Sequence, residues 1–313
     1  MSIKKKILVA PLNWGLGHAT RCIPVIEQQL HQGNELIIAA DGVPLSLLKS
    51  RFPQCTFIEW KGVDIHYSGN MILAMMLQIP KILWGIYKEH QRLKNIIDEH
   101  KIDVVISDNR FGLWNKKIHS IFITHQVNII SPFAEKLLFK INKWFIEKYD
   151  ECWVPDYEGE NNLSGNLSHP KNEYYRKHFP KNIRYIGPQS RFKKGNSNLE
   201  MRYEVVGIVS GPEPQRTIFF EKLKSDFEKM EGKTLLIAGT PNHSKFISQD
   251  SKLEIVPHLN DDDFVAALYS TKKIICRSGY STIMDLHELG LKAEMVATPG
   301  QTEQEYLVGL HKK

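Results

Sequence analysis

Cysteine is scarce in this sequence, and no apolar run is long enough to cross a membrane. The 313 residues contain 4 cysteines, all far apart and without a C-x-x-C pair: Cys22, Cys55, Cys152 and Cys276. This spacing is typical of small buried side chains in a reducing compartment and excludes a disulfide or zinc framework. The most apolar stretch, 71–86, is interrupted by Gln78, Pro80 and Lys81, so it is too short to span a bilayer.

The sequence also has little excess charge, no low-complexity segment and no short repeat. Its 41 Lys and Arg against 35 Asp and Glu give a diffuse net charge of +6. This balance fits anionic small molecules or an anionic membrane surface, and it does not indicate a nucleic-acid partner. Because MSIKKK leads directly into a strand-like run, we expect no secretory leader and a cytoplasmic location.

Strand-like runs alternate with helix-like segments along the first half of the chain. The predicted strands are KKILVAPL, NELIIAA, TFIEW, DVVISD, SIFITH, ECWVP and IRYIGP. The predicted helices lie near 18–32, 43–51, 71–99 and 133–148. Continuous apolar strands between helices indicate a parallel sheet covered on both faces.

The alternation restarts after a segment rich in Gly, Pro, Ser and charge at 187–198, which we interpret as a linker. The later predicted strands are EVVGIVSG, KTLLIAG, LEIVPHL, KKIICRSG and AEMVATPG, and the helices lie near 215–230, 261–270 and 281–289. The chain therefore predicts an α/β fold with two Rossmann-like doubly wound domains, 1–187 and 188–313. Ligands in such folds bind beyond the carboxyl ends of the strands, here in a cleft between two facing domains.

The stretch PLNWGLGHATRCIPVI at 11–26 places a glycine-rich turn between a strand and a helix. Gly15 and Gly17 allow close approach of a ligand, and the helix start near His18 offers free N–H groups to an anion. A third glycine is missing, and only Asp41 could serve as a ribose partner, which argues against a nicotinamide cofactor. His18 is either a general base or a histidine that only caps the helix.

Two more loops of the first half follow predicted strands, ISDNRFG at 106–112 and THQVN at 124–128. Asp108 is their only carboxylate and is the alternative general base, whereas a helix cap and a strand-end turn are the structural alternatives. The predicted acceptor-binding residues are Gly15, Gly17, Thr20, Arg21, Asn109, Arg110, His125 and Gln126.

Three strand ends in the second half carry polar loops. The helix start in CRSGYSTIMDL is suited to a phosphate, with Asp285 placed for ribose hydroxyls, although the same residues would cap any helix. The other two loops are IVSGPEPQRT, suited to a diphosphate, and ATPGQTEQEYL, suited to ribose or base edges. The candidate residues are Ser210, Gly211, Gln215, Arg216, Arg277, Ser278, Gly279, Ser281, Thr282, Asp285, Gln301, Gln304 and Glu305.

Five motifs carry a resemblance to a known family. In order along the chain they are G-x-G-H-x-x-R, YIGP before the linker, the S-G-P-E loop, RSGYST with its aspartate, and TPGQTEQEYL. They resemble the GT-B glycosyltransferases of the peptidoglycan N-acetylglucosaminyltransferase (MurG-like) type, whose C-terminal domain defines glycosyltransferase family 28. The resemblance covers nearly the whole chain. It implies an inverting, metal-independent transfer without a cofactor. The donor would be a nucleotide sugar, usually UDP-linked, and the acceptor a cell-envelope glycan or lipid-linked sugar.

The resemblance also implies roles for single residues. Asp285 stands where the family places a ribose-binding carboxylate, usually glutamate, and Leu259, with His258 beside it, would contact the base. Gln304 and Glu305 match a Gln-Gln pair that helps to hold the donor, with Glu305 a departure from the pattern. The diphosphate contacts would come from Ser210, Gly211, Ser278, Gly279, Ser281 and Thr282, and His18 would lie near the acceptor.

Two departures leave alternatives open. The family continues beyond the glutamine-rich loop with further helices, whereas this sequence stops at Lys313, so we expect a truncated C-terminal domain or a different closure. The first loop also resembles the UDP-sugar hydrolase of pseudaminic acid synthesis, in which water is the acceptor. A binding protein without turnover is the third hypothesis.

Other segments are candidates for metal binding or for contact with a membrane. NDDDF at 260–264 contains a D-x-D, but at a predicted helix start the carboxylates favour the helix dipole, so we predict no metal site. The segments 71–99 and 132–149 interleave apolar residues with lysines, which indicates core-facing amphipathic helices or a peripheral contact with the inner face of a membrane.

Overall fold

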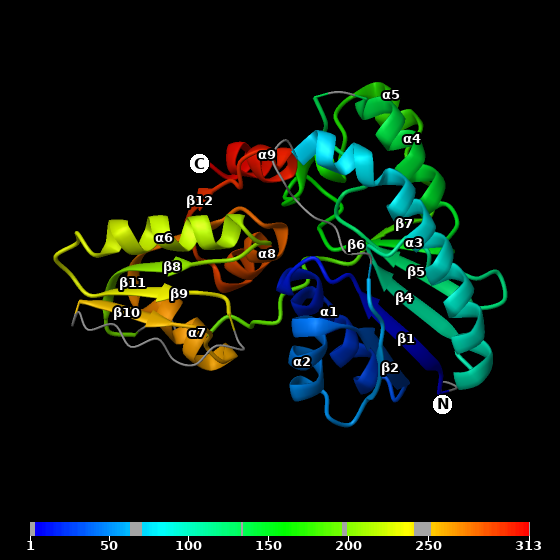
Figure 1. Cartoon of the computed structure of the whole chain (residues 1–313), viewed down its shortest axis with the longest axis horizontal. Helices are drawn as coiled ribbons and strands as arrows, with labels where there is room; N and C mark the ends of the chain where they lie inside the picture. The colour runs from blue at the N-terminus through cyan, green and yellow to red at the C-terminus, as the bar shows by residue number, and fades with distance from the viewer. Residues whose placement is uncertain (1–3, 63–70, 133, 196–198, 241–251, 313) are drawn as a thin grey trace. The chain divides into compact units, whose positions relative to one another are not determined.

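The computed structural model describes residues 4–62, 71–132, 134–195, 199–240 and 252–312. The chain divides into two compact units, Met1–Gln189 and Ser190–Lys313. The division falls inside the segment 187–198 that the sequence marks as a linker. Each unit is described by itself below (Figure 1).

The N-terminal unit is built on a parallel sheet of 7 strands in the order β3-β2-β1-β4-β5-β6-β7. Its strands are β1 (Lys6–Pro11), β2 (Glu35–Ala40), β3 (Thr56–Glu59), β4 (Val104–Asp108), β5 (His119–Ile123), β6 (Glu151–Val154) and β7 (Ile183–Tyr185). Chain order reverses between β1 and β4, which pair directly with Pro11 opposite Asp108. Ligands of doubly wound sheets bind at such a reversal, beyond the carboxyl ends of the strands.

Helices cover both faces of this sheet, which explains why its strands are apolar on both sides. They are α1 (Leu16–His31), α2 (Gly42–Arg51), α3 (Met71–His100), α4 (Glu135–Ile146), the short α5 (Glu173–Lys177) and the 3₁₀ turn η1 (Gly165–Leu167). Ile7 and Val9 of β1 pack toward α1, whereas Leu8 and Ala10 pack toward α3 on the opposite face. Figure 1 shows α3 across the sheet from α1 and α2.

The loop after β4 lies directly against the backbone of α3 at Gly112. A Cβ at this position would meet the Ile86 carbonyl oxygen at 2.4 Å and the Glu89 Cβ at 2.7 Å. His90 adds a hydrogen bond from Nδ1 to the Gly112 carbonyl at 3.3 Å, and its ring stacks on Trp114 with centroids 4.4 Å apart. The absence of a side chain at Gly112 therefore permits this helix and this loop to touch.

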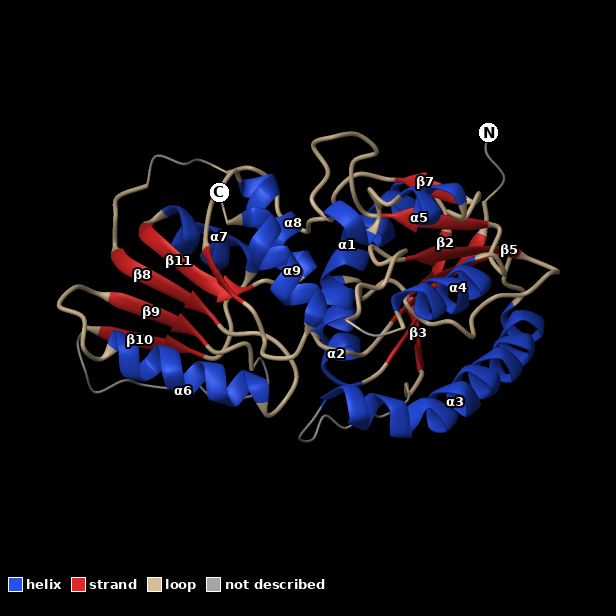
Figure 2. Ribbon diagram, turned by 90° about the horizontal axis from the view of Figure 1, so that it is seen from above, coloured by secondary structure: helices blue, strands red, loops and turns tan. Residues whose placement is uncertain are grey.

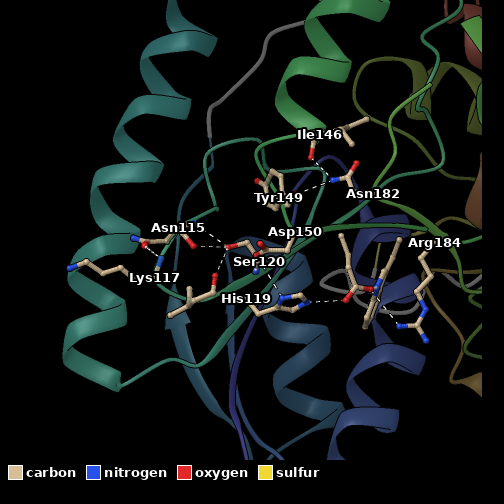
Figure 3. Close-up of polar contacts among 12 residues, drawn as sticks. Asn115, Lys117, His119, Ser120, Ile146, Tyr149, Asp150, Asn182 and Arg184 are labelled. Carbon is tan, nitrogen blue, oxygen red and sulfur yellow. Dashed lines mark hydrogen bonds and ion pairs between the residues drawn. The ribbon is translucent and has the colours of Figure 1, made fainter. Parts of the chain in front are cut away.

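A polar network joins the amino ends of β5, β6 and β7, the edge of the sheet remote from the reversal (Figure 3). Asp150 accepts a hydrogen bond from the Ser120 amide at 2.7 Å. His119 Nε2 lies 2.9 Å from Glu151 Oε1, and Asn182 donates to the Tyr149 carbonyl at 2.9 Å. These contacts fix where the three strands begin.

The C-terminal unit repeats the design with 5 parallel strands in the order β10-β9-β8-β11-β12. The strands are β8 (Tyr203–Ile208), β9 (Thr234–Ile237), β10 (Leu253–Val256), β11 (Thr271–Arg277) and β12 (Glu294–Val296). The helices are α6 (Gln215–Phe227), α7 (Asp261–Tyr269), α8 (Tyr280–Leu289) and α9 (Thr302–His311). Chain order reverses between β8 and β11. The helix α6 packs on one face of this sheet and α7 and α8 on the other (Figure 2).

The structure confirms the predicted α/β fold and the predicted strands, with helix ends that differ by a few residues. It adds η1, α5 and α9, which the sequence did not predict as helices. All four cysteines are free, as expected. Within the described residues, no helix is both long and apolar enough to cross a bilayer.

Candidate functional site

The reversal between β1 and β4 brings a histidine and an aspartate together in the N-terminal unit. His18 lies in the first turn of α1, directly after the glycine-rich turn, and Asp108 is the last residue of β4. His18 Nδ1 lies 3.0 Å from Asp108 Oδ1. The Asp108 side chain is 0% exposed, whereas that of His18 is 14% exposed. Of the two side chains only that of His18 reaches the surface, so the direct base role predicted for Asp108 does not fit its enclosed position.

The buried arginine of α1 completes this group. Arg21 Nε donates to Asp108 Oδ2 at 2.6 Å, and its Nη2 donates to Asp108 Oδ1 in a short contact. Burial alone would raise the pKa of Asp108, but Arg21 and then His18 hold the pKa well below its usual range. Burial, and next the Arg21 charge, lower the pKa of His18, while Asp108 opposes that shift. At neutral pH the group therefore holds an ionised carboxylate beside a neutral imidazole.

His125 joins the same group from the loop after β5, with its Nδ1 3.1 Å from Arg21 Nη1. Four side chains from three separate sequence motifs thus meet at one point. They are those of His18, Arg21, Asp108 and His125, and together they form the His18 group. Cys22 is a member that the sequence analysis missed, since its Sγ lies 3.4 Å from Asp108 Oδ2. Its place one residue after Arg21 was the available signal.

The remaining predicted acceptor-binding residues lie around this group, with one exception. Gly15 precedes α1 with a φ of 98°, and the Gly17 carbonyl accepts a hydrogen bond from Thr20. Asn109 and Gln126 follow β4 and β5 directly, and both are partly exposed.

The exception is Arg110, whose side chain is fully buried against Glu89. Arg110 Nη2 donates to Glu89 Oε1 at 2.7 Å, and its guanidinium lies 5.4 Å from the Trp60 ring centroid. The role predicted for it in acceptor binding does not fit this placement. Asn109 has a left-handed backbone with φ of 56°, and this turn directs the next side chain toward α3.

In the C-terminal unit, three helices begin after the adjacent strands β8, β11 and β12. α8 starts after Gly279, which has no side chain to cap it, and the residues before α6 and α9, Pro214 and Gln301, make no side-chain cap either. By contrast, α7 is capped by Asn260. At α6, however, the Glu213 carboxylate accepts from the Thr217 amide at 3.2 Å, and the Pro212 carbonyl accepts from the Arg216 amide at 3.0 Å. The uncapped starts of α8 and α9, with their helix dipoles, therefore favour an anion at this sheet edge.

The two arginines predicted to meet the diphosphate are both engaged within the protein. Arg277 is buried, donates to the Ala297 carbonyl at 2.6 Å, and lies 4.0 Å above the Phe219 ring. Arg216 pairs with Glu213 in a short contact and donates from Nε at 2.9 Å. Arg216 is therefore paired with a carboxylate, whereas Arg277 contacts only carbonyl oxygens and an aromatic ring and has no carboxylate at ion-pair distance among the described residues.

The glutamine-rich loop folds onto the end of β11. Ser278 donates to the Gln304 carbonyl at 2.9 Å, and the Gln304 side chain accepts from the Thr298 amide at 2.9 Å. Glu305 accepts from the Gly300 amide at 3.1 Å. These contacts give the loop its shape. Ser281 and Thr282 lie in the first turn of α8, whereas Ser210 and Gly211 lie in the loop between β8 and α6.

Thr298 is a further polar residue at this edge that the sequence analysis missed. Its side chain is 1% exposed, and within the described residues its Oγ1 has no hydrogen-bond partner, nor does Arg277 Nε. Buried polar atoms without partners are costly unless something satisfies them. The position directly after a strand was the available signal.

Asp285 faces the linker, because Ser190 donates to its Oδ1 at 2.7 Å. Burial raises the pKa of Asp285 to about 7, against the opposing hydrogen bond from Ser190. His258 and Leu259 follow β10, and burial lowers the pKa of His258.

The aspartates of NDDDF occupy the first turn of α7, where they interact with the helix dipole. Among the described residues, no three His, Cys, Asp or Glu side chains are grouped to hold a metal ion.

Comparison with known proteins places this geometry in context. No protein-family model matches the chain. An uncharacterized glycosyltransferase of Methanosarcina acetivorans is 23% identical over 96% of this chain and 81% of its own length. The structure of a kitacinnamycin glycotransferase matches with a TM-score of 0.63 at 15% identity, over 99% of this chain and 85% of that one. Arabidopsis thaliana UGT89C1, solved with UDP-L-rhamnose, matches with a TM-score of 0.63 at 13% identity, over 98% and 83%.

The fold is that of the GT-B glycosyltransferases. This confirms the predicted fold class. Two sequence relatives, each 23% identical to this chain, are named as glycosyltransferases as well. The His18 group lies at the chain-order reversal between β1 and β4, and the starts of α6 and α8 lie at the reversal between β8 and β11.

Proposed function

We propose that this glycosyltransferase moves a sugar from a nucleoside-diphosphate donor to an acceptor hydroxyl. The observation that carries the proposal is the contact of His18 Nδ1 with the buried carboxylate of Asp108 at 3.0 Å. A carboxylate behind an imidazole orients the ring and stabilises the imidazolium that forms when the ring accepts a proton. His18 is the general base in this proposal.

The transfer then proceeds in one displacement. His18 takes the hydroxyl proton, the acceptor oxygen bonds to the anomeric carbon from the face opposite the diphosphate, and the bond from that carbon to the diphosphate oxygen breaks. The configuration at the carbon inverts. The amides at the starts of α8 and α9 stabilise the departing anion, as oriented donors do for charge that develops in a transition state. No step in this scheme needs a metal.

A uridine donor is the first choice, because the structural neighbour UGT89C1 holds UDP-L-rhamnose. The test measures the melting temperature of the purified chain with UDP, GDP, TDP, CMP and NAD, and then sugar transfer from UDP-sugars. A shift with UDP and turnover lost in His18→Ala would support the proposal. Release of free sugar without an acceptor would instead indicate a hydrolase. Nucleotide binding without any turnover would indicate a binding protein.

The resemblance to the MurG-like enzymes leads us to propose a lipid-linked or cell-envelope acceptor, met at the inner face of a membrane. The supporting feature is the apolar face of α4, formed by Leu137, Ile141 and Trp144, which are 58%, 45% and 55% exposed. These residues recur at four- and three-residue spacing along one side of the helix, as in helices that lie in a membrane interface.

Basic side chains surround this apolar face. Lys136, Lys140 and Lys143 lie on the same helix, and the Lys148 ammonium lies 4.3 Å from the Trp144 ring centroid. Lysines beside exposed apolar residues favour anionic lipid.

Flotation with vesicles of anionic and of zwitterionic phospholipid tests the contact. Binding to the anionic vesicles should be lost in Trp144→Glu and kept in Ile218→Glu, a matched control on α6 with 55% exposure. Equal flotation of both variants would contradict the contact.

A further inference from the structure

Arg21 is the hub of the His18 group, and it contacts three side chains at once. The residue is 2% exposed. Its Nε and Nη2 donate to the two oxygens of Asp108. Its Nη2 also lies 2.8 Å from His18 Nδ1, and its Nη1 lies 3.1 Å from His125 Nδ1. A guanidinium has five N–H donors and no acceptor. Wherever one of these contacts is a hydrogen bond, Arg21 is therefore its donor.

That chemistry fixes the ring proton of His125. A nitrogen that receives a hydrogen bond cannot carry a proton of its own, so His125 Nδ1 is the unprotonated nitrogen. In a neutral imidazole one nitrogen is a donor and the other an acceptor. A hydrogen bond from Arg21 to His125 therefore requires the His125 proton to lie on Nε2.

His18 is placed between two opposed partners. Its Nδ1 can donate to Asp108 Oδ1 at 3.0 Å or accept from Arg21 Nη2 at 2.8 Å. It cannot do both, because one state needs a proton on Nδ1 and the other needs a lone pair. The Asp108 carboxylate already accepts two hydrogen bonds from Arg21 and lies 3.4 Å from the Cys22 thiol. A proton on Nδ1 would face the N–H of Arg21.

We propose that Arg21 is a positioning residue that sets the tautomer of both histidines, so that in the resting protein each carries its proton on Nε2. This inference rests on the proposed function only in giving His18 the role of base. The base form of His18 needs the other tautomer, with Nδ1–H donated to Asp108 and the lone pair on Nε2. The number of ring protons is the same in both forms. Arg21 therefore holds the base in a resting form. This form is left when the imidazole gives up its Nε2 proton to water, takes up a proton from water on Nδ1, and donates that proton to Asp108.

The first test reads the tautomers directly in the unmodified protein. Long-range proton–nitrogen NMR spectra of histidine-labelled protein, recorded well above the pKa of both rings, distinguish protonated from unprotonated ring nitrogens. For both His18 and His125 we expect an unprotonated Nδ1 and a protonated Nε2. A protonated Nδ1 on His18 in this spectrum would overturn the proposal. The measurement needs no turnover, so it stands apart from any failure of the proposed function.

Variants then test whether Arg21 is the cause. In Arg21→Met, His18 should change to the Nδ1–H tautomer, and the acid limb of the pH profile of kcat should move to higher pH, since the Arg21 charge lowers the pKa of His18. The control Arg51→Met removes an exposed arginine of α2 that pairs with Glu27 at 3.1 Å, and it should change neither readout.

If Arg21→Met does not fold, Arg21→Met with Asp108→Asn removes both buried charges and still reports on His125. Loss of the Nε2–H preference of His125 in the double variant supports the proposal, and its persistence refutes it.

Discussion

Replacing Asp108 by asparagine should destabilise the N-terminal unit more than any other single change in the His18 group. The substitution keeps the shape of the side chain but leaves the Arg21 charge, 2% exposed, without a counter-ion. Breaking a buried pair by removing one partner costs about 3–5 kcal/mol. In a unit of 189 residues, each kcal/mol lowers Tm by roughly 2–4 °C, so we expect a loss of about 6–20 °C.

The stability lost on replacing Arg21 should depend on pH, unlike the stability lost on replacing Asp108. Arg21 cannot lose its proton, so the cost of Asp108→Asn persists at every pH. In Arg21→Met the remaining carboxylate can take up a proton, so this variant should recover stability, relative to wild type, as pH falls. In the wild type the pKa of Asp108 is depressed. The stabilisation by the pair is therefore present above pH ~4 and is lost only as pH falls below that value.

Thermal unfolding of the wild type, both single variants and the double variant, at about pH 5 and pH 8, completes the cycle. The double variant should be more stable than Asp108→Asn alone, because no buried charge remains. If Asp108→Asn melted within about 2 °C of the wild type at both pH values, less than the shift for 1 kcal/mol, the pair could not be the desolvated ion pair described here.

Three further outcomes follow from other parts of the molecule. His18→Ala should lower kcat by roughly 10²–10⁴-fold while leaving the UDP-induced shift in Tm unchanged, as expected for loss of a general base; a loss of the Tm shift would contradict this. Burial raises the pKa of Asp285 to about 7, so the wild type should lose stability as pH rises from about 4 to about 7. Asp285→Asn should flatten that dependence in a series of thermal melts at different pH. Arg184→Ala should cost less than ~1 kcal/mol in urea unfolding, because its 3.5 Å pair with Glu151 is exposed; a larger loss would show that the network in Figure 3 is cooperative.

The strands and most helices could be predicted from the sequence because their patterns are local. Uninterrupted apolar runs such as ILVA at 7–10 indicate a buried strand, and the glycine-rich turn that follows indicates where the next helix begins. The helix α9 was missed because its sequence TEQEYL resembles a polar strand-end loop. Its acidic residues Glu303 and Glu305 in the first turn were the helical signal.

The contacts of the candidate site could be predicted only in part, because they depend on the order of strands. His18 and Asp108 are 90 residues apart, and they meet because β4 pairs with β1. The sequence placed both at carboxyl ends of strands but could not pair them. It also could not show that Arg110 turns away to Glu89, because that direction follows from the left-handed backbone at Asn109. The Ala297 carbonyl that accepts from Arg277 lies in another loop of the unit, and the carboxylate that pairs with Arg216 lies one turn away.

The contact at Gly112 ties two parts of the N-terminal unit together mechanically. The loop that begins at Asp108 touches the backbone of α3 through a position that has no room for a Cβ. Any force that moved α3 away from the sheet, such as its burial in a lipid surface, would pull on this loop within four residues of the carboxylate. Conversely, Gly112→Ala would push helix and loop apart from within. Gly112→Ala therefore tests how rigidly the His18 group is coupled to α3 on the outside of the same unit.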